Sequence, residues 1–444
     1  MRTGKIITTT MIICLLMAAA CGCAAPGRET GAQQQAAGPQ QAAGPQLGQQ
    51  PATRPQPAAG PQPGQQQAAG PQPDQQAAGP QPGSQQTAHP QPSKDSWDDR
   101  EVIRSMELLY ADQFSVDYYD DGCAMISIRD SGRFLVVPEQ GTQPEGLPED
   151  VTVLRQPVKN IYLVATSAMD LFKSLDAMDR ITLSGTDAQG WYIEEARQAL
   201  EDGGMFYAGK YNAPDYELIL SKSCGLAIES TMISHSPEVK EQLEQLGIPV
   251  LVERSSYESH PLGRMEWLKL YGVLTGREEQ AEACFRKQME NLKPVLDQDA
   301  TGKTVAFFYI SSNGYVNVRK SGDYVAKMIE LAGGTYVPEG LDGNGNALST
   351  MNMQMEAFYA AAKEADYIIY NSTIDGELES LAQLLDKSSL LADFKAVKEG
   401  NVWCTEKSLF QETMGLGNMI LDIHRILTEE APDQEEMAYM HRLR

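Results

Sequence analysis

The chain has 444 residues, of which 60 are acidic and 36 are basic, so its formal net charge is −24. This balance argues against nucleic acid and an anionic membrane surface as partners, because both repel a negatively charged protein. The length is sufficient for two lobes, each with a hydrophobic core of its own. We expect the protein to be a monomer.

Residues 1–21 have the layout of a secretory signal peptide. Two basic residues precede a largely apolar run over residues 6–16, and small residues lead directly into Cys21. The run is shorter than the roughly 20 residues of a membrane-spanning helix. A cysteine directly after the cleavage site resembles a bacterial lipobox, in which the sulfur is acylated. We therefore predict lipidation at Cys21, with Cys23 as the alternative, and an extracytoplasmic protein anchored by lipid to the outer face of the cell membrane.

Residues 22–96 consist almost entirely of Gln, Pro, Ala and Gly, and the sequence Ala-Ala-Gly-Pro-Gln recurs in them. Such a segment has too few apolar side chains to offset the entropy of ordering. Proline favours an extended conformation, so about 70 residues at ~3.1 Å each reach at most roughly 200 Å. We predict a disordered tether. The alternative is a proline-rich ligand for the aromatic groove of a partner.

Residues 97–157 are predicted to form a β-rich extension. Three short β-type runs between residues 114 and 137 are separated by Asp-Asp-Gly and Asp-Ser-Gly turns, which indicates a small meander. From residue 160 the pattern changes, because the buried-type strand NIYLVATS runs into a helical pattern, and strand and helix then alternate. This alternation indicates a mainly parallel sheet covered by helices.

A long helical stretch separates two groups of strands. It runs from Leu262 to about Leu296 and is broken only at Gly272 and Gly276. A helix of roughly 30 residues would span about 45 Å. The sequence therefore predicts an α/β protein with two lobes, 158–261 and 299–444, joined by a bridging helix, 262–298, with a C-terminal helix and tail in the second lobe. The later strands are predicted at residues 225–230, 248–254, 304–311, 365–372 and 401–406.

The chain lacks the sequence signatures of enzymes and metal sites. It has no G-x-S-x-G, H-E-x-x-H or P-loop motif, and its five histidines make no pair at metal-ligand spacing. Residues 342–346 begin like a calcium loop, but the required glycine and glutamate are missing after them. We predict no catalytic residue, no metal site and no cofactor. Four widely spaced cysteines are expected to be buried free thiols: Cys123, Cys224, Cys284 and Cys404.

The order of several motifs resembles a known family. NIYLVATSAMDLF, LAIEST and EVKEQLEQLGIPVLVE are followed by LYGVLTGREEQAEACF, GDYVAKMIELAGG and a final EGNVW strand. This order is similar to that of the substrate-binding proteins of iron-chelate and cobalamin ABC importers, over roughly residues 158–427. The resemblance implies two lobes that capture a ligand, and a permease with its ATPase as partner. Members from bacteria without an outer membrane are lipoproteins, which agrees with Cys21.

Ligands of open α/β sheets bind at the carboxyl ends of strands, where loops converge. Polar and aromatic residues stand at those ends, and further aromatic residues cluster among Gly and Asp turns in the first lobe. Aromatic rings suit a large, partly apolar chelate, and Ser, Asn and Arg can bond its polar edges. The candidate ligand-binding residues are Ser167, Trp191, Tyr192, Tyr211, Ser230, Thr231, Tyr257, Arg264, Asn313, Tyr315, Arg319, Asn371 and Ser372.

The segment HPLGRMEW, at the expected mouth of the cleft, has two interpretations. In one, Arg264 binds an anionic ligand and the histidine binds a metal or a hydrogen-bond partner. In the other, the proline starts a helix and the tryptophan packs within the lobe. The resemblance also implies that one glutamate on each lobe contacts the permease, here Glu238 and Glu412. Glu238 is at the same time a favourable charge for the first turn of a helix.

These observations favour a tethered receptor that captures a metal chelate and delivers it to an importer. An iron-siderophore complex is the first choice of ligand, and cobalamin or haem comes next. The alternative is a chelatase-like enzyme or a surface sensor built on the same two-lobe scaffold. Turnover of a bound tetrapyrrole would indicate the enzyme, whereas saturable one-to-one binding without chemistry would indicate the receptor.

Overall fold

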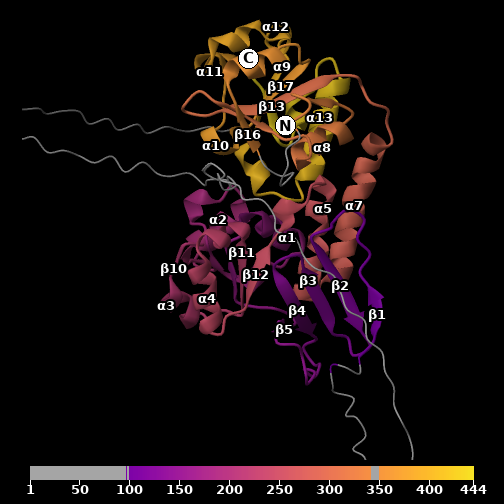
Figure 1. Ribbon diagram of the computed structural model, residues 1–444, viewed down its shortest axis with the longest axis vertical. Coiled ribbons are helices and arrows are strands. Elements are labelled where there is room, and N and C mark those ends of the chain that lie inside the picture. The colour runs from indigo at the N-terminus through magenta and orange to yellow at the C-terminus, as the bar shows by residue number, and fades with distance from the viewer. Residues whose placement is uncertain (1–96, 98–99, 342–349) are drawn as a thin grey trace, which may run out of the picture. The chain divides into compact units, whose positions relative to one another are not determined.

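The computed structural model describes Trp97, residues 100–341 and residues 350–444 (Figure 1). The predicted signal peptide with both candidate lipidation sites, the predicted tether and residues 342–349 lie outside these residues. Within the described part, one sheet precedes two α/β lobes, each of which has a sheet of its own. The predicted α/β class, with two lobes and a β-rich N-terminal extension, is therefore confirmed.

The N-terminal sheet has five strands in the order β1-β2-β3-β4-β5. Its neighbouring strands are antiparallel except β4 and β5, which run parallel. The sequence predicted the three central strands, and the structure adds one strand at each edge. β5 follows a loop over residues 138–150, because a parallel neighbour cannot be reached through a tight turn. The strands are β1 (Val102–Ser105), β2 (Phe114–Tyr119), β3 (Ala124–Ile128), β4 (Gly132–Val137) and β5 (Val151–Arg155).

Lobe 1 has a five-stranded sheet in the order β12-β11-β6-β7-β8, and every neighbouring pair is parallel. Helices α1 and α2 pack on one face of this sheet, and α3 and α4 pack on the other. The carboxyl ends of the strands consequently lie along one edge of the sheet. The elements are β6 (Ile161–Leu163), α1 (Met169–Ser174), β7 (Ile181–Ser184), α2 (Glu194–Glu201), β8 (Phe206–Tyr207), β9 (Gly209–Lys210), β10 (Ala213–Pro214), α3 (Tyr216–Ser221), β11 (Leu226–Ser230), α4 (Pro237–Gln245) and β12 (Val250–Glu253).

The prediction of one long bridging helix is wrong, because three helices occupy this stretch: α5 (Pro261–Glu266), α6 (Leu268–Thr275) and α7 (Glu278–Leu296). Gly276 ends α6 in the left-handed conformation, with φ of 71°, which glycine adopts without strain. α6 and α7 then pack against each other, and a Cβ at Gly272 would lie 2.8 Å from the Ala281 side chain. The helix that leads into lobe 2 is therefore α7 alone, with a length of about 28 Å.

Lobe 2 has a mixed sheet in the order β16-β14-β13-β17-β18-β19, and β15 pairs with β13. The central pairs are parallel, whereas β14, β16 and β19 join in antiparallel fashion. Helices α8 and α13 cover one face, and α9, α11 and α12 cover the other. The elements are β13 (Thr304–Ile310), β14 (Val316–Arg319), α8 (Tyr324–Leu331), β15 (Thr335–Val337), β16 (Thr350–Met353), α9 (Met355–Ala362), β17 (Tyr367–Tyr370), α10 (Ser372–Asp375), α11 (Leu381–Lys387), α12 (Lys395–Glu399), β18 (Val402–Thr405), α13 (Leu416–Thr428) and β19 (Met440–Arg442).

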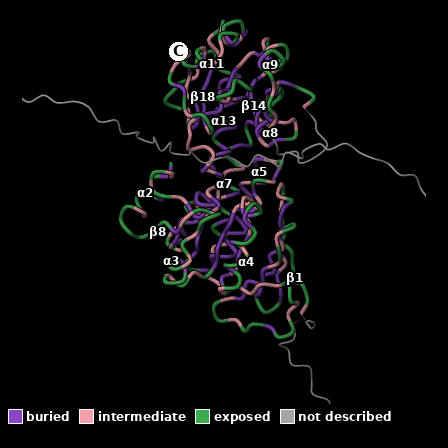
Figure 2. The backbone as a smooth tube through the Cα atoms, turned by 60° about the vertical axis from the view of Figure 1, so that its left-hand side comes forward, coloured by how far each residue is buried: buried purple, intermediate pink, exposed green. Residues whose placement is uncertain are grey.

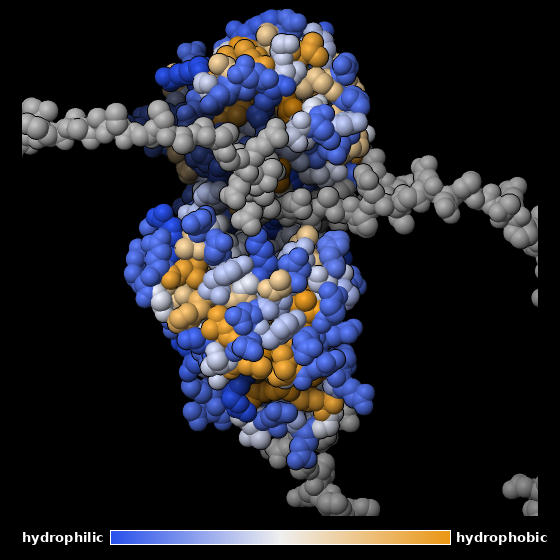
Figure 3. All heavy atoms as spheres, turned by 90° about the vertical axis from the view of Figure 1, so that its left-hand side faces the viewer, coloured by the Kyte–Doolittle hydropathy of each residue, from blue (hydrophilic) through white to orange (hydrophobic). Residues whose placement is uncertain are grey.

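One continuous cluster of buried side chains joins the N-terminal sheet, lobe 1, helices α5–α7 and the inner face of lobe 2. Trp267, Tyr271 and Phe285, from or next to these helices, are among its largest members. Figure 2 shows the buried residues concentrated inside each lobe. The face in Figure 3 is largely hydrophilic, with hydrophobic side chains in patches over both the upper and the lower part of the molecule. Scattered patches of this kind are ordinary for a folded protein.

Candidate functional site

The two lobes contact each other through the segment 411–414, which follows β18 and the 3-10 helix Lys407–Phe410 and precedes α13. The Gln411 side chain accepts a hydrogen bond from the Tyr192 amide and donates one to the Gly190 carbonyl, both at 2.7 Å. Each of these bonds joins a loop of lobe 1 to a loop of lobe 2 at the carboxyl ends of strands. The structure thus brings together the two edges at which the sequence predicted a ligand site.

Two further bonds strengthen this contact. The Thr413 hydroxyl donates to the Ser167 carbonyl at 2.7 Å, and the Met414 amide donates to the Asp170 carboxylate at 2.8 Å. Asp170 is only 6% exposed, and this burial, opposed by the Met414 amide, raises its pKa to about 6. The junction therefore contains one titratable group whose proton affinity depends on its enclosure.

An aromatic pair lies beside these bonds. The ring centroids of Tyr192, in lobe 1, and Phe410, in lobe 2, are 5.8 Å apart in an edge-to-face arrangement. The Tyr192 side chain is 43% exposed, so the ring keeps a free surface at the junction. Of the candidate residues, Tyr192 and Ser167 are thereby placed directly at the inter-lobe contact.

Helix α5 makes a second contact with lobe 2. The Arg264 guanidinium lies 3.6 Å from the centroid of the Tyr324 ring, at the first residue of α8. It also donates to the Ser256 carbonyl at 2.7 Å. Tyr257, on the neighbouring turn, stacks under Arg254 at 4.3 Å. The Arg264 guanidinium is thus already in contact with Tyr324 and Ser256. A ligand that binds it would share it with this cation–π contact.

The histidine of HPLGRMEW is neutral. Burial and the Lys327 ammonium lower the pKa of His260 to about 4, and its Nδ1 accepts a hydrogen bond from the Leu262 amide. The Tyr110 ring, from the N-terminal extension, stacks on the imidazole at 4.6 Å. Pro261 is the first residue of α5 and Trp267 is buried, as the structural interpretation of this segment predicted.

Four of the candidate side chains are buried and bound within their own lobe. The Trp191 indole donates to Ser184 and to the Thr186 carbonyl, both at 3.1 Å. The Asn371 side-chain oxygen caps α10 by accepting a hydrogen bond from the backbone amide of Thr373. The Ser372 and Thr405 hydroxyls are hydrogen-bonded to each other. These side chains and Arg319, paired with Asp323 at 3.6 Å, serve packing and local structure. In each of them the polar group is bonded internally or enclosed, and their role as ligand contacts stays a prediction.

The remaining candidates lie at strand ends or in loops, and they form no hydrogen bond or ion pair with the other lobe among the residues that the structure describes. Asn313 and Tyr315 are exposed in the turn between β13 and β14. Ser230 caps the turn after β11 through the Met232 amide at 3.3 Å, and Thr231 is half-buried next to it. Tyr211, in the β9–β10 hairpin, packs on the side-chain cluster that α3 and α4 cover.

The two glutamates predicted to contact a permease differ in their surroundings. Glu238 is exposed in the first turn of α4, after Pro237 at the first helical position. Glu412 is half-buried, and its carboxylate accepts a hydrogen bond from the Tyr439 hydroxyl. Glu238 is thus freely accessible, whereas a partner would have to compete with Tyr439 for Glu412.

The part of the chain that the structure describes contains no group of three or more His, Cys, Asp or Glu side chains arranged to hold a metal ion. Among those same residues, no helix is both long and apolar enough to cross a membrane. The four cysteines of the globular region are unpaired; Cys123 and Cys404 are buried, and Cys224 and Cys284 are half-buried.

Sequence reasoning missed the residues that join the lobes. Gln411 lies 219 residues from its partner Tyr192, so no local pattern indicates the bond. Asp170 has a visible signal, because an acidic residue interrupts the apolar run AMDLF at the start of α1. Thr413 and Met414 follow Phe410 after a predicted strand, and extending the rule of strand ends by a few residues would have included them.

No family model matches the chain. An uncharacterized lipoprotein of Methanocaldococcus jannaschii is 25% identical over 73% of this chain and 82% of its own length. A second uncharacterized lipoprotein of the same organism is 23% identical over 68% of this chain and 77% of its own. The crystal structure of a periplasmic haem binding protein of Vibrio cholerae superposes with a TM-score of 0.50 and 18% identity, over 62% of this chain and 99% of that one. The chain has the fold of the periplasmic binding proteins. The resemblance that the sequence indicated is thus confirmed at the level of the fold.

Within this periplasmic binding protein fold, the junction around segment 411–414 is the point where the strand-end loops of both lobes meet. Because ligands of such sheets bind at the carboxyl ends of strands, this junction is the candidate binding site. Its aromatic surface comes from Tyr192 and Phe410, one from each lobe.

Proposed function

We propose that this protein is the extracytoplasmic substrate-binding component of an ABC importer, and that it is not an enzyme. It captures a small molecule between its lobes and delivers it to the permease and its ATPase. The observation that supports this most is the meeting of strand-end loops from two separate sheets around one exposed aromatic ring, Tyr192. The fold shared with a haem binding protein, and relatives named lipoproteins, point the same way.

The ligand that fits this site best is a metal chelate, with an iron-siderophore complex first and cobalamin or haem next. A chelate of this size presents flat or partly apolar faces, which aromatic rings such as Tyr192 and Phe410 cover well. The Arg264 guanidinium can bond the anionic edge of the chelate. For this the chelate has to displace the Tyr324 ring, which now lies against the guanidinium. The metal is part of the cargo, so the protein itself needs no cofactor.

For the partner, we propose that Glu238 and Glu412 meet basic residues of the permease, and that acylation of Cys21, or of Cys23, holds the monomeric protein on the outer face of the membrane. Charge reversal at both glutamates, Glu238→Lys with Glu412→Lys, should abolish uptake at saturating ligand. Because Glu412 also bonds Tyr439 and lies in the segment that joins the lobes, ligand affinity is measured in parallel, and Glu238→Lys alone should leave it intact. Unchanged transport by the double variant would remove this contact. Loss of membrane attachment in Cys21→Ser, compared with Cys23→Ser, identifies the acylated residue.

The deciding experiment is purification of the full-length protein from its native host grown under iron limitation, followed by mass spectrometry and an absorption spectrum. We expect one chelate per chain, released unchanged on denaturation. A bound tetrapyrrole that is converted during incubation would contradict the receptor and favour a chelatase-like enzyme. A protein that binds no chelate in this preparation, nor when siderophore, cobalamin or haemin is added, would remove the proposed ligand class.

A further inference from the structure

The Gln411 side chain is the most fully engaged inter-lobe contact of the described residues. It is 1% exposed, and both polar atoms of its amide bond the backbone of lobe 1. Its oxygen faces the Tyr192 N–H and its nitrogen faces the Gly190 carbonyl, so only one orientation of the amide satisfies both bonds. A side chain held in this way fixes the position of residues 190–192 relative to lobe 2.

The two bonds of Gln411 do not act alone. Thr413 and Met414 bond Ser167, in the 3-10 helix Thr166–Ala168 after β6, and Asp170, in the first turn of α1. Residues 411–414 therefore contact two separate places of lobe 1 from one short stretch of lobe 2. Because the stretch is continuous, separating the lobes must break all four bonds together.

We propose that residues 411, 413 and 414 form an inter-lobe clasp, and that Gln411 is the positioning residue that holds Tyr192 against Phe410 at the binding site. This inference rests on the proposed function, because it assigns to the clasp the retention of the ligand. The aromatic pair combines one ring from each lobe, so this part of the site exists only while the clasp is closed.

The chemistry of the clasp suits a reversible contact. Three of its four bonds join neutral groups, and such bonds contribute little net free energy, because water replaces them when the lobes part. When the clasp opens, water can bond the Tyr192 N–H and the Gly190 carbonyl in place of Gln411. The lobes can consequently separate for release without breaking a buried ion pair at residue 411.

The test is hydrogen exchange of the ligand-free, full-length protein with the substitution Gln411→Ala. We expect the Tyr192 amide to exchange at least tenfold faster than in the wild type, while the midpoint of thermal unfolding changes little. Gln242→Ala is the matched control, because Gln242 is exposed on α4, and it should leave Tyr192 exchange unchanged. Thr413→Val keeps the shape but removes one donor, so its effect should be in the same direction and smaller.

Ligand retention is measured separately with haemin as the probe. Faster haemin dissociation from Gln411→Ala than from the wild type and from Gln242→Ala supports the role in retention, and equal rates overturn it. Unchanged Tyr192 exchange in Gln411→Ala overturns the clasp, whatever haemin does. A wild type that binds no chelate at all would instead refute the proposed function, with the exchange result still deciding whether the clasp exists.

Discussion

Lobe 1 makes two joints of different chemistry, one with the N-terminal sheet and one with lobe 2. In the first, the fully buried Glu266 carboxylate accepts hydrogen bonds from the amides of Leu109, Tyr110 and Ala111 at 2.8 to 3.0 Å. The Lys269 ammonium lies 3.2 Å from the same carboxylate. These bonds are charge-assisted and removed from water, which makes them strong.

A second buried carboxylate extends this joint. Glu258 accepts from the Asp112 and Gln113 amides and from the Trp267 indole at distances near 3.0 Å. Backbone packing is equally close, since a Cβ at Gly263 would lie 2.9 Å from the Tyr110 carbonyl oxygen. Loop 109–113 is thus hydrogen-bonded to α5 and packed directly against its backbone.

The joint with lobe 2 consists of the clasp, the Arg264 contact with Tyr324 and the apolar packing of α5 and α7 against α8 and α13. Of its hydrogen bonds, only the one to Asp170 involves a carboxylate. The difference indicates which parts move together. A joint of buried charges costs several kcal/mol to break, whereas neutral bonds exchange with water at little cost. We infer that the N-terminal sheet and lobe 1 form one body, against which lobe 2 can move.

The largest expected effect comes from breaking the permanent joint. Glu266→Gln removes the charge that holds three backbone amides and leaves Lys269 without its buried partner. We expect the free energy of unfolding to fall by about 3–5 kcal/mol, measured by urea denaturation. Glu282→Gln is the control, because Glu282 is exposed and also pairs with Lys269, at 3.1 Å. A loss below about 1 kcal/mol in Glu266→Gln, in the range of a surface pair, would mean that the joint is not permanent.

Much of this arrangement was readable in the sequence. Three strands of the lobe 1 sheet, β6, β11 and β12, were predicted because all-parallel strands are buried on both faces and read as continuous apolar runs. Strands β7 and β8 were not predicted. The edge strand β1 was not predicted either, since its four residues are all exposed and show no such run. Gly276 indicated a break in the helical stretch. That this break is a turn separating α6 from α7 depends on the left-handed backbone of Gly276, which sequence alone does not give.

The site was harder to predict than the fold. Tyr192 was predicted from the aromatic residues clustered among turns, and it lies at the inter-lobe contact. The rule of strand ends predicted Ser167, which lies at the same contact. It could not separate Ser167 from Asn371 or Ser372, because polar residues after strands also cap the next turn. Whether a side chain faces the partner lobe or its own backbone is decided by contacts between residues far apart in the chain.

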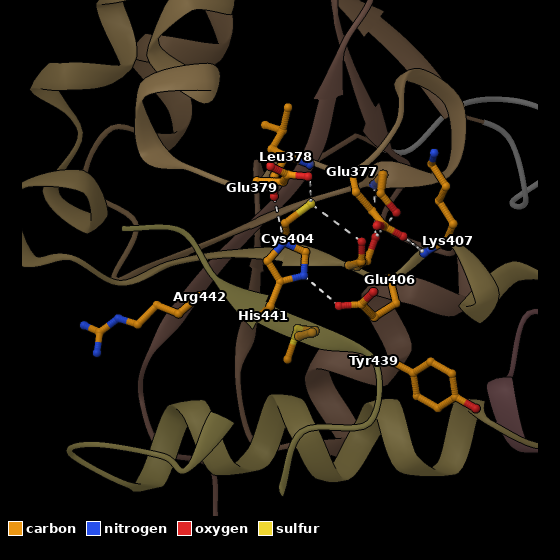
Figure 4. A network of polar contacts seen from close by, with 12 residues as sticks. Glu377, Leu378, Glu379, Cys404, Glu406, Lys407, Tyr439, His441 and Arg442 are labelled. Carbon is orange, nitrogen blue, oxygen red and sulfur yellow. Dashed lines mark hydrogen bonds and ion pairs between the residues drawn. The ribbon is translucent and has the colours of Figure 1, made fainter. Parts of the chain in front are cut away.

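A second prediction concerns how the clasp is held on its own lobe. Strand β19 pairs with β18, and the Tyr439 hydroxyl next to it donates to Glu412, inside the clasp segment. His441 fastens this strand, since its ring nitrogens lie 2.7 Å from a Glu406 oxygen and from the Leu378 carbonyl (Figure 4). Both partners are acceptors, so both nitrogens must carry protons and the imidazole is cationic.

Replacing this histidine should weaken lobe 2 in a pH-dependent way. The neighbouring Cys404, the Leu378 carbonyl and Glu406 raise the pKa of His441 to about 10, against the opposing effect of burial. A folded pKa above the unfolded value of 6.5 means that the stabilisation is complete below pH 6.5 and is lost as the pH rises towards 10. His441→Asn should therefore cost about 2 kcal/mol at pH 6 and much less at pH 10, in urea denaturation.

The control for His441→Asn is His235→Asn, because His235 is exposed at the end of a turn in lobe 1. It should change stability little at either pH. An equal loss at pH 6 and at pH 10 in His441→Asn would show that the ring acts by packing and not by its charge. In that case the contrast between charged contacts inside a rigid unit and neutral contacts between two units would not hold for lobe 2.

The smallest effect is expected at Asp170, the carboxylate of lobe 1 that accepts a hydrogen bond from the clasp. Burial raises the pKa of Asp170 to about 6, the Met414 amide and Lys173 oppose this, and the carboxylates of Glu412 and Glu195 add to it. Cys284 of α7 and Tyr439 also face this carboxyl. If the lobes part, Asp170 meets water and its pKa returns towards 3.8. The closed state then binds the proton more tightly than the open state, so acid favours closure.

Linkage converts this difference into a measurable shift. Between pH 7 and pH 5 the ratio of closed to open molecules should rise by about tenfold, seen as a shorter inter-lobe distance between spin labels on the two lobes. Asp170→Asn keeps an acceptor for the Met414 amide but cannot titrate, so its distance should not depend on pH. Asp202→Asn, an exposed position after α2, should behave as the wild type. A distance in the wild type that shortens as the pH rises would reverse the sign of the linkage, and with it the conclusion that closure encloses Asp170.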